Sequence, residues 1–211
     1  MNYHYAPSHT NLSTARNLAV EKTNGEWISF LDCDDYLAKN KLELQVDIIN
    51  KKINSLGLIY GIRKWVVMES EMGTTFGKKF QNKSLQTDLP NGKIFNRLLI
   101  KNFVPLSSSL ILKTAFFNVG GINNHLTYAE DYDLFLKISK NYKAVFVNEI
   151  CSYYRVHEKN MSKSYIHIGY SESMRCLKIY FPNPFAIIGY LLYGLKLIIF
   201  RISNKTNHSF V

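Results

Sequence analysis

The stretch ISFLDCDD, residues 28–35, decides the fold class of this chain. The apolar residues that open it predict a buried strand over residues 27–31. Three carboxylates, Asp32, Asp34 and Asp35, follow at the carboxyl end of that strand. Because open α/β sheets bind ligands where their strands end, the stretch predicts an α/β fold with a binding site at this edge.

Two interpretations of the acidic cluster stay open on the motif alone. Crowded carboxylates repel one another, and a divalent cation that grips a diphosphate would neutralise them. Aspartates after a strand also form solvated turns and helix caps. Asp35 or Asn40 is placed to cap a helix expected over residues 41–54. The other motifs of the chain must decide between the two.

Composition predicts a folded globular protein in a reducing compartment. The 211 residues are 46% hydrophobic, enough for one sizeable core, or for one domain with an appendage. The three cysteines are odd in number and far apart, which favours the cytosol, and no signal-peptide pattern occurs. Although the net charge is +10, the basic residues are dispersed, so no nucleic-acid partner is predicted.

Periodicity and turn residues predict the secondary structure. Helices are expected over residues 15–22, 41–54, 93–101 and 130–141. Strands are expected over residues 27–31, 56–68, 109–112, 144–147 and 153–156. Residues 69–91 are expected to form a mobile loop, and Gly120-Gly121 a turn. Ser13 or Thr14 is expected to cap the first helix, and Gly25 to end it.

An apolar run covers residues 185–200 and is interrupted by Lys196. It is shorter than the roughly 20 residues that span a bilayer comfortably. Its basic and aromatic flanks suit a helix that lies on an anionic inner leaflet. A helix packed in the core or between subunits is the alternative. We expect residues 166–211 to form a helical tail that associates with the membrane.

Two further features carry possible chemistry. Glu130 and Asp131 begin an amphipathic helix, where acidic residues complement the macrodipole, and Asp131 could also serve as a general base for an attacking hydroxyl. His157 follows a predicted strand. A lone histidine is usually a surface or hydrogen-bonded residue, but a neutral imidazole can complete a site for a manganese-like ion.

Four motifs, taken in order, resemble the family 2 glycosyltransferases. They are Ala15-Arg16-Asn17, Leu31-Asp32-Cys33-Asp34-Asp35, Gly120-Gly121-Ile122 with Glu130-Asp131-Tyr132-Asp133-Leu134 after it, and Tyr154-Arg155-Val156-His157. The resemblance runs from about residue 9 to residue 162. It implies a GT-A fold: a Rossmann-like mixed sheet flanked by helices, with a partial domain over residues 1–165 and the apolar helix after it.

The resemblance implies an enzyme that moves a sugar from a nucleotide-sugar to an acceptor hydroxyl, usually with inversion. Many members build bacterial surface polysaccharides at the cytoplasmic face of the membrane. The expected partners are therefore a nucleotide-sugar donor, a glycan or lipid-linked glycan acceptor and the membrane surface. The expected location is cytoplasmic, peripheral to the inner face of the membrane.

The resemblance also implies roles for the residues that contact the donor. Asp34 would bind a divalent cation, Mn²⁺ or Mg²⁺, on the donor diphosphate. Asp32 would contact the ribose or the water shell of the metal. His157 falls where some members supply a further metal ligand. Arg16 matches an arginine near the donor phosphates, or it anchors its helix to the sheet, and the sequence leaves both open.

On the acceptor side, Asp131 matches the proposed base, and Glu130 beside it would shape the acceptor site. The pattern departs from the family at its start, because the usual strand, Pro-Thr-Tyr-Asn-like segment and second strand do not precede residue 9. We therefore expect an N-terminally incomplete GT-A domain. The alternative function is a truncated, inactive, membrane-peripheral fragment with a binding role.

Two other classes with acidic motifs fit less well. Haloacid-dehalogenase-like phosphatases place Thr or Val two residues after the second Asp, where this chain has Tyr36. Their later Gly-Asp-x-x-x-Asp pair is missing from the sequence. A calcium loop starting at Asp32 fails because Tyr36 and Leu37 occupy ligand and glycine positions.

Overall fold

A computed structural model describes residues 4, 10–81, 83–157, 160 and 165–208, with the backbone alone at residues 76 and 204–208. A five-stranded sheet in the order β1-β4-β3-β5-β2 lies at its centre. The strands are β1 (Trp27–Ile28), β2 (Tyr36–Leu37), β3 (Leu56–Val67), β4 (Leu110–Leu112) and β5 (Lys143–Val156). The two long strands β3 and β5 run parallel and the other neighbours antiparallel, which confirms the predicted mixed sheet.

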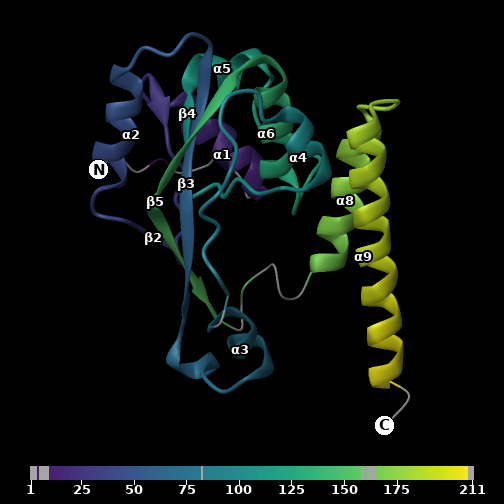
Figure 1. Cartoon of the computed structure of the whole chain (residues 1–211). Coiled ribbons are helices and arrows are strands. Elements are labelled where there is room, and N and C mark those ends of the chain that lie inside the picture. Colours follow the sequence, from purple (N-terminus) through teal and green to yellow (C-terminus); the bar gives the residue numbers. More distant parts are fainter. Residues whose placement is uncertain (1–3, 5–9, 82, 158–159, 161–164, 209–211) are drawn as a thin grey trace.

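Helices cover both faces of this sheet (Figure 1). On one face, α2 (Lys41–Asn50) packs Leu44, Ile48 and Ile49 against β3, β4 and β5. The other face carries α1 (Leu12–Glu21), α4 (Phe95–Ile100), α5 (Lys113–Asn118) and α6 (Glu130–Asn141). Outside α4 and α6 lies the helical pair α8 (Ile166–Lys178) and α9 (Pro184–His208).

The larger apolar core extends from the sheet into the C-terminal helices. Leu58 of β3 and Phe135 of α6 are fully buried, and α8 and α9 add Leu177 and Ala186 to the same cluster. Burying such side chains contributes roughly 1.5–3 kcal/mol each. The inner faces of α8 and α9 therefore share the core of the α/β part. The outer face of α9 is apolar as well.

Several predicted boundaries need correction at α1. Asn11, and not Ser13 or Thr14, is the N-cap, because its Oδ1 accepts the Thr14 N–H at 2.8 Å. Ser13 is buried, and its hydroxyl donates to the Leu126 carbonyl at 2.9 Å. The helix ends at Glu21, before Gly25 is reached. Because the Ser13 hydroxyl binds this distant carbonyl, Ser13 does not cap the helix.

The strand and loop predictions were also partly wrong. The strand expected over residues 27–31 is ladder-paired only at Trp27–Ile28. The two strands expected over residues 144–156 are the single β5. The expected loop at residues 69–91 contains the 3₁₀ turn η1 (Glu69–Glu71) and helix α3 (Thr75–Gln81).

At α2, Asn40 is the N-cap residue without a side-chain cap bond, and Asp35 is no cap. The helix ends at Asn50 rather than at residue 54, and Lys52 two residues later has a φ of 49°. Helix α6 matches its predicted range of 130–141.

Candidate active site

Arg16 joins three of the sequence motifs in space. From α1, its Nη2 donates to Asp32 Oδ1 at 2.6 Å, and its Nη1 donates to Glu130 Oε1 at 2.7 Å. The Arg16 and Glu130 side chains are both about nine-tenths buried, whereas Asp32 is 42% exposed. A buried guanidinium suits this role because its planar fork holds two carboxylates in fixed positions. Arg16 therefore fixes the start of α6 against residues 32–35, which we call the acidic turn.

Asn17, the next residue of the same motif, holds the glycine turn. Its Oδ1 accepts the Ile122 N–H at 2.9 Å, and its Nδ2 donates to the Ile122 carbonyl at 2.8 Å. Gly120 and Gly121 have φ values of 79° and 65°, which favour glycine. A Cβ on Gly121 would also lie 2.9 Å from the Asn17 side chain. The turn prediction is confirmed, and Asn17 is a positioning residue that sequence reasoning missed.

Glu130 and Asp131 lie together in the first turn of α6. Burial, and then the neighbouring Asp131 carboxylate, raise the pKa of Glu130 to about 7. Burial likewise raises the pKa of Asp131 above its usual range. Both carboxyl groups thus hold protons more tightly than exposed acids do.

Glu172 of α8 holds the segment that leads into α6. Its carboxylate accepts the backbone N–H groups of Thr127, Tyr128 and Ala129 at 2.8–3.1 Å. Ala129 is the N-cap residue of α6, so these bonds fix the backbone directly before the helix. The helix that carries Glu130 is therefore positioned by a buried acid more than forty residues away. No local signal in the sequence points to Glu172.

The strand β5 ends beside the acidic turn and brings His157 to Asp34. His157 Nε2 lies 2.9 Å from Asp34 Oδ2. Asn160 orients this histidine, because its Oδ1 accepts the His157 N–H at 2.6 Å and its Nδ2 lies 3.2 Å from Nε2. The backbone N–H of Arg155 donates to Asp35 at 3.3 Å, and burial raises the pKa of Asp35. Asp35 thus has a structural role beneath the turn.

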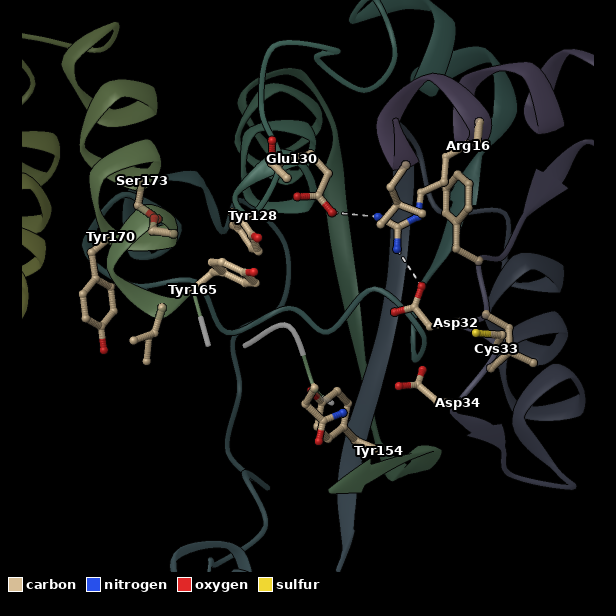
Figure 2. A pocket seen from close by; sticks show the side chains of 18 of the residues that line it. Arg16, Asp32, Cys33, Asp34, Tyr128, Glu130, Tyr154, Tyr165, Tyr170 and Ser173 are labelled. Atoms are coloured by element: carbon tan, nitrogen blue, oxygen red, sulfur yellow. Dashed lines mark hydrogen bonds and ion pairs between the residues drawn. The ribbon is translucent and has the colours of Figure 1, made fainter. Parts of the chain in front are cut away.

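A cavity of about 800 Å³ opens in front of these groups. Figure 2 shows Asp32, Asp34, Glu130 and Arg16 on one side, and Tyr128, Tyr165 and Tyr170 on the other. The acidic side comes from the turn, α1 and α6, and the aromatic side comes from α8 and the segment before α6. This size suits a ligand with both polar and ring-shaped parts.

Four of the six predicted site residues line this cavity: Arg16, Asp32, Asp34 and Glu130. Asp131 lies beside Glu130 but outside the lining. His157 reaches the site through Asp34. Asn160 and Tyr154, to which the sequence assigned no role, line the cavity too. An asparagine three residues after His157 is the local signal that points to Asn160.

The chemistry of the Asp34–His157 pair fits a divalent cation. A carboxylate oxygen and an imidazole nitrogen 2.9 Å apart are spaced as two neighbouring ligands of one ion can be. Within the described ranges, no group of three or more His, Cys, Asp or Glu side chains is arranged to hold a metal. Phosphate oxygens or water would have to complete such a site.

Comparison with known proteins defines the class. The model of the family described as "Glycosyltransferase like family 2" matches residues 2–181. The chain belongs to this family. The mixed sheet flanked by helices, with the apolar helix after it, is accordingly the GT-A-like arrangement predicted from the four motifs.

Among curated proteins, the chain is 31% identical to the "UDP-Glc:alpha-D-GlcNAc-diphosphoundecaprenol beta-1,3-glucosyltransferase WfgD" of Escherichia coli. The match covers 84% of this chain and 64% of that protein. It is 26% identical to an Escherichia coli chondroitin synthase, over 93% of this chain and 25% of the synthase. The chain thus spans less than two thirds of the length of either relative.

Two solved structures share the fold. Residues 1–349 of S. aureus TarS in complex with UDP-GlcNAc give a TM-score of 0.56 at 16% identity, over 80% of this chain and 46% of that one. The mannosyltransferase PcManGT from Pyrobaculum calidifontis, in complex with GDP-Man and Mn²⁺, gives a TM-score of 0.57 at 14% identity. That match covers 90% of this chain and 51% of PcManGT. At these identities the likeness concerns the fold.

Proposed function

We propose that this chain acts as a glycosyltransferase, moving a sugar from a nucleotide-sugar to an acceptor hydroxyl with inversion, in the synthesis of bacterial surface polysaccharide. The observation that carries the proposal is the bridge from Asp32 through Arg16 to Glu130. It joins three separate motifs at the wall of one cavity. Membership of the glycosyltransferase family and the nucleotide-sugars bound by the two structural relatives support the same class of reaction.

Asp34 and His157 are the proposed ligands of a divalent cation, Mn²⁺ or Mg²⁺. Bound there, such an ion supplies a Lewis acid for the diphosphate that leaves the sugar. Asp32, fixed by Arg16, is proposed to contact the ribose or the water shell of the metal. The role of Arg16 in this proposal is to anchor α1 and to hold the Asp32 and Glu130 carboxylates in fixed positions.

Asp131 is the proposed general base. It would take the proton of the acceptor hydroxyl as the oxygen attacks the anomeric carbon from the face opposite the leaving group. Its raised pKa makes it a stronger base than an exposed aspartate. Glu130, bound to Arg16, is proposed to shape the acceptor side of the cavity beside it.

The proposed acceptor is a glycan, and more specifically a lipid-linked one, as named for the WfgD relative. Helix α9 supports a place at the cytoplasmic face of the membrane, with residues 166–211 as a membrane-associating tail. Residues Pro184–Ser203 are long and apolar enough to cross a membrane by length and composition. Because one face of α9 packs on α8 and α4, we propose a peripheral position with the outer face in the lipid interface.

The test is transfer from radiolabelled UDP-glucose to a lipid-linked N-acetylglucosamine diphosphate, with Mn²⁺ and the full chain. We expect wild-type turnover, and a loss of about 100-fold or more in kcat for Asp34→Ala and for Asp131→Asn. Asp47→Ala is the matched control, because Asp47 is an exposed acid on α2. Its activity should equal that of wild type.

Two results would contradict the proposal. Undiminished transfer by Asp34→Ala and Asp131→Asn, with their folds intact by circular dichroism, would remove these residues from the reaction. Absence of wild-type turnover with a panel of nucleotide-sugars, combined with retained lipid or protein binding, would favour the non-catalytic fragment instead.

A further inference from the structure

A second charged cluster lies on β3, beyond the acidic turn. Arg63 stacks over the rings of Trp65 and Tyr154, with its guanidinium carbon 5.4 and 5.0 Å from the ring centroids. Trp65 and Tyr154 are register partners on the parallel strands β3 and β5. Lys83, just after α3, places its ammonium 4.0 Å from the centroid of Trp65. We call Arg63, Lys83, Trp65 and Tyr154 the cation–aromatic cluster.

The cations of this cluster form no ion pair with a carboxylate in the described part of the chain. Neither Arg63 nor Lys83 forms an ion pair there, and Arg63 Nε is buried with no hydrogen-bond partner. Burying a guanidinium without a partner is costly, and burial lowers the pKa of Arg63. Two cations that repel each other and keep donors free form a site that an anion would stabilise.

The position of the cluster connects it to the proposed reaction. Tyr154 contacts Arg63 and also lines the cavity that holds Asp32 and Asp34. The charges of Asp131 and Asp32 act on Arg63 as well. An anion bound at Arg63 would therefore lie beside the cavity, on the side where β3 and β5 continue toward α3 (Figure 1).

We propose that the cation–aromatic cluster binds the phosphate or diphosphate of a sugar-phosphate acceptor, with Arg63 and Lys83 as donors to its oxygens. This inference rests on the proposed transferase function and names the charge of its acceptor. The donor diphosphate is a second source of the same anion chemistry. The acceptor is favoured because the charge of Asp131, the proposed base for the acceptor hydroxyl, acts on Arg63 more strongly than the charge of Asp32 on the donor side.

The test measures binding to the full chain by calorimetry, with N-acetylglucosamine 1-phosphate, its methyl glycoside and UDP with Mn²⁺ as probes. We expect the phosphate to bind more tightly than the methyl glycoside. Lys83→Met and Arg63→Met should weaken binding of N-acetylglucosamine 1-phosphate about 10-fold or more. Binding of UDP should not change. Lys64→Met is the matched control, because Lys64 is exposed and alternates to the opposite side of β3.

Lys83 is exposed, so its variant tests the site even where Arg63→Met impairs folding. Arg63→Lys should recover part of the affinity. Weaker UDP binding with unchanged phosphate binding would assign the cluster to the donor, and equal effects on phosphate and methyl glycoside would show a structural role. Either result would overturn the proposal. Transfer to neutral acceptors with no phosphate preference would overturn it too, while leaving the transferase function standing.

Discussion

At the scale of single residues, the site is organised by charges that the protein buries in pairs. Arg16 is shielded from water and holds Glu130 at 2.7 Å, so removing Arg16 would leave the buried Glu130 carboxylate without this partner. The sequence motif identified Arg16 but left two roles open. Its two ion pairs join α1 to the acidic turn and to α6.

Glu130 leads to a prediction about pH. Its pKa in the folded protein is about 7 against an ordinary value of 4.5, so the folded state holds this proton more tightly than the unfolded chain. The stabilisation is therefore complete below about pH 4.5 and is lost as the pH rises through about 7. Glu130→Gln, which stays neutral, should reduce the fall in unfolding free energy across this window by about 1–3 kcal/mol.

Urea denaturation at several pH values measures this. The control is Glu149→Gln, since Glu149 is exposed and its substitution should leave the slope unchanged. An unaltered pH dependence in Glu130→Gln would show that Glu130 titrates normally in the folded protein.

At the scale of elements, local patterns predicted which segments are helices better than they predicted the residues at which those helices begin and end. The apolar stripe of α6 gave the range 130–141 correctly, because its inward residues recur with helical periodicity. The cap of α1 was misplaced, because Ser13 donates to the distant Leu126 carbonyl and Asn11 caps instead. The acidic residues do form a turn, in which the Asp35 N–H donates to the Asp32 carbonyl at 3.0 Å, but Asp35 does not cap α2.

At this scale, we predict that the Glu172 carboxylate contributes to the stability of the fold. Glu172→Ala would leave the N–H groups of residues 127–129 without their acceptor, and we expect the free energy of unfolding to fall by about 2–4 kcal/mol. Glu172→Gln keeps an acceptor oxygen and should cost less. Thermal and urea denaturation measure both. Glu149→Ala serves as the exposed control, and a loss in Glu172→Ala no larger than in this control would argue against the role of Glu172 at residues 127–129.

At the scale of the whole molecule, α9 joins the core on one side and leaves an apolar surface on the other. Ala186 and Tyr193 are buried against the rest of the protein. The outer face of α9 comprises the exposed Ile188, Leu191, Leu192, Leu195, Ile198, Ile199 and Ile202. A contiguous apolar face of this kind marks an interaction surface.

We predict that this outer face binds lipid. Leu191→Glu combined with Leu195→Glu should weaken binding to vesicles of phosphatidylglycerol and phosphatidylethanolamine about 10-fold or more, because both leucines are more than half exposed and available to the interface. Cosedimentation measures it. Leu42→Glu, at a similarly exposed leucine on α2, is the control. Equal vesicle binding by the double variant and the Leu42→Glu control would point to a protein partner instead. So would a wild-type dimer that the double variant converts to a monomer.

The sequence by itself determined the order of motifs, the class of fold and four residues that line the cavity: Arg16, Asp32, Asp34 and Glu130. It could do so because strand ends, helix starts and glycine turns leave local patterns. Only the tertiary structure decided which residues contact one another across the fold. Asn17 on the glycine turn, Glu172 beneath α6 and Arg63 between two aromatic rings depend on contacts between distant segments, and no local pattern encodes those.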